Sequence, residues 1–128
     1  DFEKAKEYHE LALSIYQKKL GPENVQVATS YNNLGLVHSK LGDFEKAKEY
    51  HELALSIYQK KLGPENVDVA TSYNNLGLVH DKLGDFEKAK EYYQLALSIR
   101  QKKLGPENVD VATSYNNLGQ KATTCACL

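Results

Sequence analysis

The four histidines are the side chains of this chain best suited to metal binding or acid–base chemistry, and they stand at positions 9, 38, 51 and 80. His9 and His51 are each followed by a glutamate, but a leucine stands at the fourth position beyond each, so the His-Glu-x-x-His zinc motif is not met. His38 and His51 could approach each other across one helical hairpin. An imidazole pair without carboxylate or thiolate partners binds zinc poorly. We therefore predict core histidines satisfied by hydrogen bonds, and no metal site.

The two cysteines, Cys125 and Cys127, lie two apart near the end of the chain and make no disulfide framework. A reduced, cytoplasmic setting fits this pattern best. The last four residues, from Cys125 to Leu128, match a prenylation motif ending in leucine, which requires Leu128 to be the natural C-terminus. Against that interpretation, Cys127 is a poor aliphatic residue and only Lys121 stands upstream as a cation. The alternative is the remnant of a terminal helix.

The glycines do not indicate nucleotide chemistry. Gly35 and Gly42 are not followed by a Gly-Lys-Ser/Thr sequence, and they lie in a helical pattern rather than after a strand. No Ser/His/Asp or Cys/His arrangement stands apart from the repeated background. A catalytic site is a single place, whereas these residues occur in copies. The sequence thus predicts a protein that is not an enzyme and carries no cofactor.

The segment Thr-Ser-Tyr-Asn-Asn-Leu-Gly organises the chain, since it recurs every 42 residues at 29–35, 71–77 and 113–119. The stretches 1–42 and 43–84 differ at two positions only. The second copy differs from the third in three pairs: His51/Tyr93, Glu52/Gln94 and Tyr58/Arg100. A fixed period of about 20 to 50 residues is typical of a solenoid, whose units bury their apolar faces by stacking on one another.

Apolar residues recur at helical spacing within each copy, and Gly-Pro pairs interrupt them. We expect one array over 1–128, with a helix at 1–20, helical hairpins at 25–61 and 67–103, and a last helix with an irregular tail at 109–128. The expected N-caps are Asp1, Asn24, Asp43 and Asp85. Because the chain opens partway through the pattern and has no methionine, we expect an excerpt from a longer array.

Two details of the helical pattern bear on packing. The stripe of apolar and aromatic positions in the helix at 1–20 includes Phe2 and Tyr8, and that of the next helix ends on Leu41. Gly35 lies within a helix, where glycine costs roughly 1 kcal/mol against alanine. Such a glycine is expected where a neighbouring helix packs too close for a side chain.

Composition excludes two classes of partner. Sixteen basic and 17 acidic residues give a net charge of −1, and the two signs are interleaved. Nucleic-acid binding needs a one-sided basic face, which this pattern does not supply. No apolar run approaches the ~20 residues of a membrane span. We expect neither nucleic acid nor membrane as a partner.

The repeat resembles the tetratricopeptide repeat. The nine positions that carry the resemblance are Tyr31, Leu34, Gly35, His38, Gly42, Phe44, Ala47, His51 and Ala54. They recur in the second copy as Tyr73, Leu76, Gly77, His80, Gly84, Phe86, Ala89, Tyr93 and Ala96. The usual repeat has about 34 residues. The longer repeat here is similar to those of kinesin light chains and nephrocystin-3-like proteins, with a Gly-Pro loop in place of the usual helix-ending proline.

The resemblance implies an all-α superhelix of about six antiparallel helices in a right-handed stack. It implies that the first helix of each pair lines a concave groove. The implied groove residues are Thr29, Asn32, Asn33, Leu36, Lys40, Thr71, Asn74, Asn75, Leu78, Lys82, Asn116 and Asn117. Asparagine offers donors and an acceptor that suit a peptide backbone. The alternative is that these asparagines bond to neighbouring helices or to water.

The resemblance favours a scaffold that binds an extended peptide segment of a protein partner in this groove. Kinesin light chains take acidic, tryptophan-bearing peptides, but here only Lys40 and Lys82 are basic in the groove, and Asp81 offsets the second. We expect a ligand of mixed apolar and polar character. The alternative function is a structural spacer whose copies associate head-to-tail, because the first and last helices would both leave apolar faces uncovered.

Overall fold

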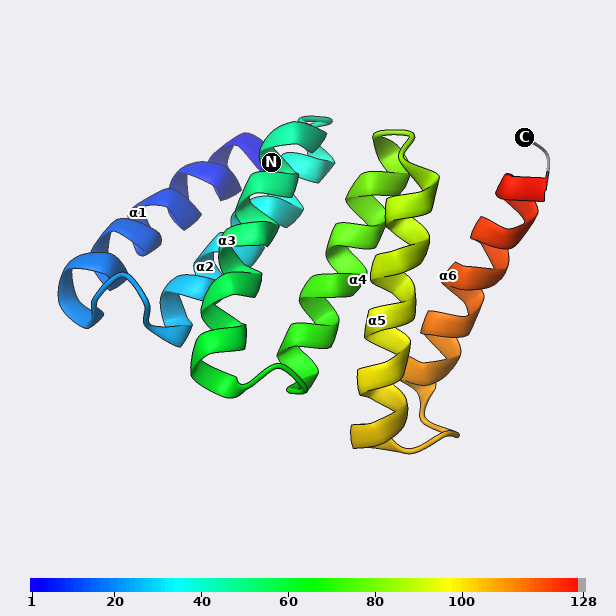
Figure 1. The fold of residues 1–128 in the computed structure, drawn as a ribbon. Helices are drawn as coiled ribbons and strands as arrows, with labels where there is room; N and C mark the ends of the chain where they lie inside the picture. The colour runs from blue at the N-terminus through cyan, green and yellow to red at the C-terminus, as the bar shows by residue number, and fades with distance from the viewer. Residues whose placement is uncertain (127–128) are drawn as a thin grey trace. The chain divides into compact units, whose positions relative to one another are not determined.

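The structure is a computed structural model that describes the backbone of residues 1–126 and the side chains of residues 1–120. Within this part of the chain every regular element is a helix, as predicted (Figure 1). The helices are α1 (Phe2–Leu20), α2 (Val25–Lys40), α3 (Phe44–Leu62), α4 (Val67–Lys82), α5 (Phe86–Leu104) and α6 (Val109–Ala126). They form two compact units, α1 to α3 in residues Asp1–Pro64 and α4 to α6 from Glu65 onward.

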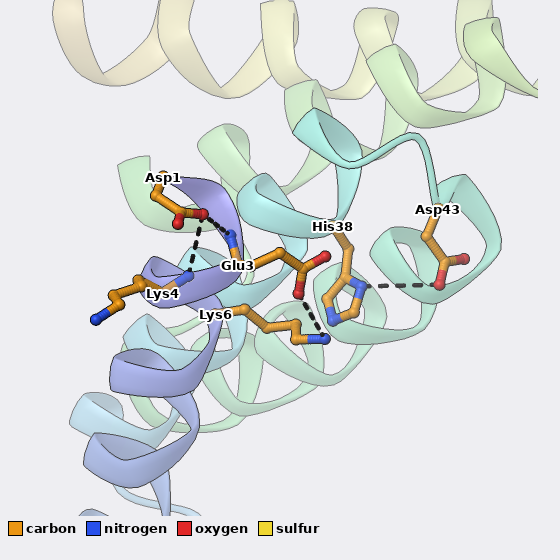
Figure 2. Close-up of polar contacts among 6 residues, drawn as sticks. All are labelled: Asp1, Glu3, Lys4, Lys6, His38 and Asp43. Carbon is orange, nitrogen blue, oxygen red and sulfur yellow. Dashed lines mark hydrogen bonds and ion pairs between the residues drawn. The ribbon is translucent and has the colours of Figure 1, made fainter.

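Aspartate and asparagine side chains begin the helices, as predicted. Asp1 Oδ1 accepts a hydrogen bond of 2.9 Å from the Glu3 N–H and a longer one from the Lys4 N–H (Figure 2). Asp43 and Asp85 accept in the same way at α3 and α5. Asn24 Oδ1 accepts from the Gln26 N–H at 2.8 Å. Each of these bonds satisfies a backbone donor that the first turn of a helix leaves without a partner.

The turn between α2 and α3 is short because one glycine ends the first helix and the next residue caps the second. Gly42 has φ of 83°, a left-handed conformation that only glycine adopts at little cost. The Asp43 N–H donates to the His38 carbonyl at 2.9 Å and the Gly42 N–H to the Ser39 carbonyl at 3.1 Å. Since the Asp43 side chain caps α3, the two helices turn back on each other as a hairpin.

Each unit has its own core between helices that are neighbours in the chain. In the first unit α2 packs on both α1 and α3, and Ala28, Leu34 and Ala54 are fully buried. In the second unit α5 packs on both α4 and α6, and Ala70, Leu76 and Ala96 are fully buried. The helical spacing of the apolar residues predicted these positions. No helix of the described residues is long and apolar enough to cross a membrane.

Three expectations about the buried stripes are wrong. Phe2 and Tyr8 of α1 are exposed, because the side of α1 that carries them has no helix against it. Leu41 is also exposed, because it is the C-cap of α2 and not part of the helix. Ser30 and Val37 of α2 are also buried.

Gly35 and Gly77 are the closest points of helix packing. A Cβ added to Gly35 would lie 2.6 Å from His51 Cε1, and one added to Gly77 would lie 2.5 Å from Tyr93 Cε1. The predicted close approach at Gly35 is therefore confirmed. The group that fills the space is an aromatic side chain of the following helix and not its backbone.

We predict that Gly35→Leu and Gly77→Leu destabilise their units by about 1–3 kcal/mol, because overpacking displaces a buried ring. Gly119→Leu is the matched control, since a Cβ at Gly119 meets no atom within 4 Å. It should be neutral or slightly stabilising, because leucine favours a helix over glycine by up to about 1 kcal/mol. Urea unfolding at low protein concentration measures the difference. Equal midpoints for Gly35→Leu and Gly119→Leu would contradict the tight packing at Gly35.

Candidate functional site

The predicted groove residues of the first unit share one face of α2. Positions 29, 32, 33, 36 and 40 follow each other at helical spacing, which places their side chains along one stripe. Leu36 is 43% exposed, although its neighbour Leu34 is fully buried. Thr29 and Lys40 are exposed and Asn33 is half-buried. An exposed leucine between an amide and an ammonium group gives this stripe mixed apolar and polar character.

The second unit brings predicted site residues of two helices together. Asn117 of α6 donates a hydrogen bond from Nδ2 to Oδ1 of Asn74 on α4 at 2.9 Å. On α4, Leu78 is 43% exposed and Lys82 is exposed, as on the corresponding stripe of α2. Thr71 is half-buried, and Asn75 is buried. Asn116 stands exposed on α6. Some of the predicted site residues, such as Asn75, therefore lie in the core of the unit, and others, such as Leu78 and Lys82, face solvent.

Asn32 has an inward role that supports the structural alternative for this residue. Its Oδ1 lies 3.0 Å from Nδ1 of His51, the ring that fills the space at Gly35. His51 is 1% exposed. With an amide oxygen as the acceptor, the proton of the neutral imidazole sits on Nδ1 and donates to Asn32. The same asparagine thus lies on the predicted site stripe and satisfies a buried histidine of the next helix.

Thr29 is also bonded within the unit. Its hydroxyl donates to the Val25 carbonyl at 3.2 Å, and its Oγ1 lies 2.9 Å from the Tyr58 hydroxyl of α3. Because the threonine proton is used on the carbonyl, the tyrosine hydroxyl donates to Oγ1. Leu36 and Lys40 are the other exposed side chains of this stripe.

Three of the four histidines are buried, as predicted, while His9 is half-buried. The predicted hydrogen bond is present for His51, but Nδ1 of the buried His38 has no hydrogen-bond partner among the described residues. His38 stacks on Tyr50 with ring centroids 5.3 Å apart, and His80 stacks on Tyr92 at 5.4 Å. Nδ1 of His38 lies 3.8 Å from Oδ2 of Asp43 (Figure 2). No group of three or more His, Cys, Asp or Glu residues that could hold a metal ion occurs among the described residues. The prenylation motif that begins at Cys125 lies outside the residues whose side chains the structure describes.

Arg100 was not among the predicted functional residues, but in the structure it is buried and bonds to α6. Its Nη1 donates to Ser114 Oγ at 3.0 Å and, more weakly, to the Asp110 carbonyl at 3.4 Å. Burial lowers the pKa of Arg100, and the Asp110 carboxylate partly opposes this shift. The available signal was that Tyr58, its counterpart one copy earlier, is replaced here by a cation.

We predict that His51 makes the first unit less stable in acid. Burial lowers the pKa of His51 from its ordinary 6.5 to about 4. The unfolded chain therefore binds a proton that the folded chain resists. The stabilisation by neutral His51 is fully present above pH 6.5 and is lost as the pH falls toward 4, with a slope of at most about 1.4 kcal/mol per pH unit.

The matched control is His51→Tyr, since tyrosine occupies the corresponding position 93. Urea midpoints of both proteins are compared at pH 7 and pH 5. The parent should lose more stability than the variant, because a tyrosine stays neutral between pH 5 and pH 7, and at the corresponding position burial raises the pKa of Tyr93 further above this range. The same loss in both would show that other groups cause the acid sensitivity.

Comparison with known proteins agrees with this geometry. The family model for the tetratricopeptide repeat matches residues 1–60, 37–102 and 68–123. No curated protein matches the chain. BtubC (BKLC) from P. vanneervenii is 34% identical with a TM-score of 0.90, over 98% of this chain and 50% of that one. A putative kinesin light chain from Podosopora anserina with nearly identical TPR-like repeats is 23% identical with a TM-score of 0.85, over 94% of this chain and 57% of that one.

The chain thus spans about half the length of these solved structures. Both likenesses cover nearly all of its helices, and the first of them extends to the sequence. Together with the helical hairpins and the 42-residue period, they confirm the predicted solenoid of helical repeats. The chain belongs to the tetratricopeptide-repeat family.

Proposed function

We propose that the chain is a protein-interaction module that binds an extended peptide segment along the stripe of α2 and the equivalent stripe of α4. Proteins of this family generally mediate protein–protein interactions. The observation that carries the proposal is the pair Leu36 and Leu78, each 43% exposed, on helices whose other leucines, Leu34 and Leu76, are fully buried. An apolar side chain that packing leaves exposed at the same place in each unit suits contact with an apolar side chain of a ligand.

The asparagines have two roles in this proposal. Asn32 holds His51, and Asn74 accepts from Asn117, so these amides fix the helices that carry the stripes. Asn33, which is half-buried on α2, supplies an amide group for the peptide backbone. Asn32 holds α2 against α3 and is adjacent to Asn33 in sequence. The amide group of Asn33 is therefore presented to the ligand from a helix whose position is fixed.

The proposed ligand is an extended chain with alternating apolar and polar side chains. Lys40 has Ser39 beside it, whereas Lys82 has the half-buried Asp81. An acidic ligand group therefore fits better beside Lys40. We expect micromolar affinity, rising where more repeats engage one peptide.

The module is proposed to act without catalysis, in the cytoplasm, with protein partners and without nucleic acid or membrane. The single array over 1–128 and the concave, right-handed form that the resemblance implies belong to this proposal. The alternative, a structural array that associates head-to-tail, is favoured by uncovered faces on α1 and α6.

The binding test replaces the exposed leucines. A peptide selected from a random library against the parent protein serves as the ligand, and fluorescence anisotropy measures its affinity. We expect Leu36→Glu with Leu78→Glu to weaken binding by tenfold or more, since a leucine side chain contributes about 1.5–3 kcal/mol when buried. Leu53→Glu with Leu95→Glu is the matched control, because these leucines of α3 and α5 are 46% and 45% exposed. Equal loss in both double variants would contradict a site on the stripes.

A second variant tests the amide. We expect Asn33→Ala to weaken the same peptide severalfold, because a lost hydrogen bond is worth about 0.5–1.5 kcal/mol. Circular dichroism first checks that this variant folds. If it folds and binds like the parent, Asn33 is structural and the leucine contacts alone explain binding.

A further inference from the structure

One side of α1 has no helix packed against it among the described residues. The sequence of α1 is identical to that of α3. In α3 the positions Ala47, His51 and Ala54 are buried against neighbouring helices. In α1 none of the residues is buried, and the corresponding Ala5, His9 and Ala12 are only half-buried. The contacts that α3 makes with α2 are therefore available on α1 and unused.

One side of α6 is also uncovered, and it carries the residues that would receive such a helix. Up to Gly119 its sequence is identical to that of α4. Val111 and Ser114 of α6 are buried on the side of α5, where Arg100 bonds to Ser114. Ala112 and Gly119 are exposed, whereas their equivalents in α4, Ala70 and Gly77, are buried. The uncovered part of α6 is the surface with which α2 receives α3.

From this complementarity we propose that α6 of one copy of this chain binds α1 of a second copy, and that the contact repeats the one α2 makes with α3. The proposal concerns copies of these 128 residues. It does not need the peptide-binding stripes. The sequences identify the partner helix, since α3, which packs on α2, has the same sequence as α1.

The notch at Gly119 fixes the register of this contact. A Cβ at Gly119 would meet nothing within 4 Å, while those at Gly35 and Gly77 would meet the rings of His51 and Tyr93. His9 is the residue of α1 that corresponds to His51. The ring of His9 from the second copy therefore fits over Gly119. Its Nδ1 then meets Asn116, the counterpart of the Asn32 that accepts from His51 at 3.0 Å.

Two further pairs match along the same helices. Tyr31 stacks on Tyr50 at 5.9 Å within the first unit, and their counterparts Tyr115 and Tyr8 are both exposed. The loop glutamate forms an ion pair with a lysine of the next helix in both units, Glu23 with Lys60 at 3.0 Å and Glu65 with Lys102 at 2.8 Å.

The third glutamate of this series is Glu107, and the first lysine is Lys18; both are exposed. Within residues 1–120, neither Glu107 nor Lys18 forms an ion pair. Opposite charges therefore meet at the loop end of the proposed contact, as they do inside each unit. This surface pair adds little affinity by itself, and its main effect is on orientation.

The proposed contact is heterologous, because it joins two different faces. Each joined pair of copies still has one unused α1 face and one unused α6 face, so further copies can add. Ala122 stands in the sequence where His38 stands in the first copy, so the stack of His38 on Tyr50 has no counterpart at this end. The contact between copies is expected to be weaker than that between α2 and α3.

The test blocks each face separately and uses the full chain in reducing buffer. Gly119→Leu fills the notch on α6, where no atom of the same chain lies close enough to be displaced. Tyr8→Glu places a charge on α1 at a side chain that is 67% exposed. Sedimentation velocity over a range of concentrations measures the mass. We expect the parent to grow beyond the 14.4 kDa of one chain, and each variant alone to lose this association.

Mixing the two variants is the decisive arm. Gly119→Leu keeps an intact α1 face and Tyr8→Glu keeps an intact α6 face, so their mixture should form two-chain species and nothing larger. Charge reversal adds a rescue: Glu107→Lys alone should weaken association, and Glu107→Lys with Lys18→Glu should restore it. A parent that stays at one chain up to millimolar concentration overturns the proposal. Association that survives Gly119→Leu also overturns it, because the copies would then meet through other faces.

Discussion

The structure depends on one packing event, the insertion of an aromatic ring into the space that a helix glycine leaves. His51 fills the space at Gly35, and Tyr93 fills the space at Gly77. A side chain on either glycine would push the two helices apart, so the ring fixes both their separation and their register. The glycine weakens its own helix by about 1 kcal/mol relative to alanine, and close packing of a large buried ring offsets that loss.

The two rings that do this work differ in chemistry. His51 needs an acceptor for Nδ1–H and finds it in Asn32, which ties the core to the stripe proposed for binding. Tyr93 is larger, lies buried, and has Asp81 close enough that the carboxylate adds to the effect of burial in raising its pKa. The same backbone therefore accepts either ring. What changes between the repeats is the link of the ring to its polar neighbours and its response to acid.

The helices and their ends could be predicted almost completely from the sequence, because local features determine them. The helical spacing, the Asp and Asn caps and the Gly-Pro breaks each act over a few residues. Exposure of Phe2 and Tyr8 is different, since identical sequences occur in α1 and α3 and only the presence of a neighbouring helix distinguishes them. The hydrogen bond between Asn32 and His51 also depends on the position of the next helix. Helical periodicity places Asn32 on one face of α2, but it does not identify the hydrogen-bond partner.

Near-identity of the repeats has a consequence for specificity. When every helix of one kind can pack on every helix of the other kind, the sequence alone does not restrict which pair forms, and departures between copies must do so. Arg100 is such a departure: it directs its guanidinium to Ser114 of α6, while Tyr58 directs its hydroxyl to Thr29 of α2. Helix α5 therefore binds α6 through a buried guanidinium group, which would be costly to leave without acceptors. Ser30 and Ser72 stand at the position of Ser114 in α2 and α4, so Arg100 stabilises the pairing of α5 with α6 without excluding these helices as partners.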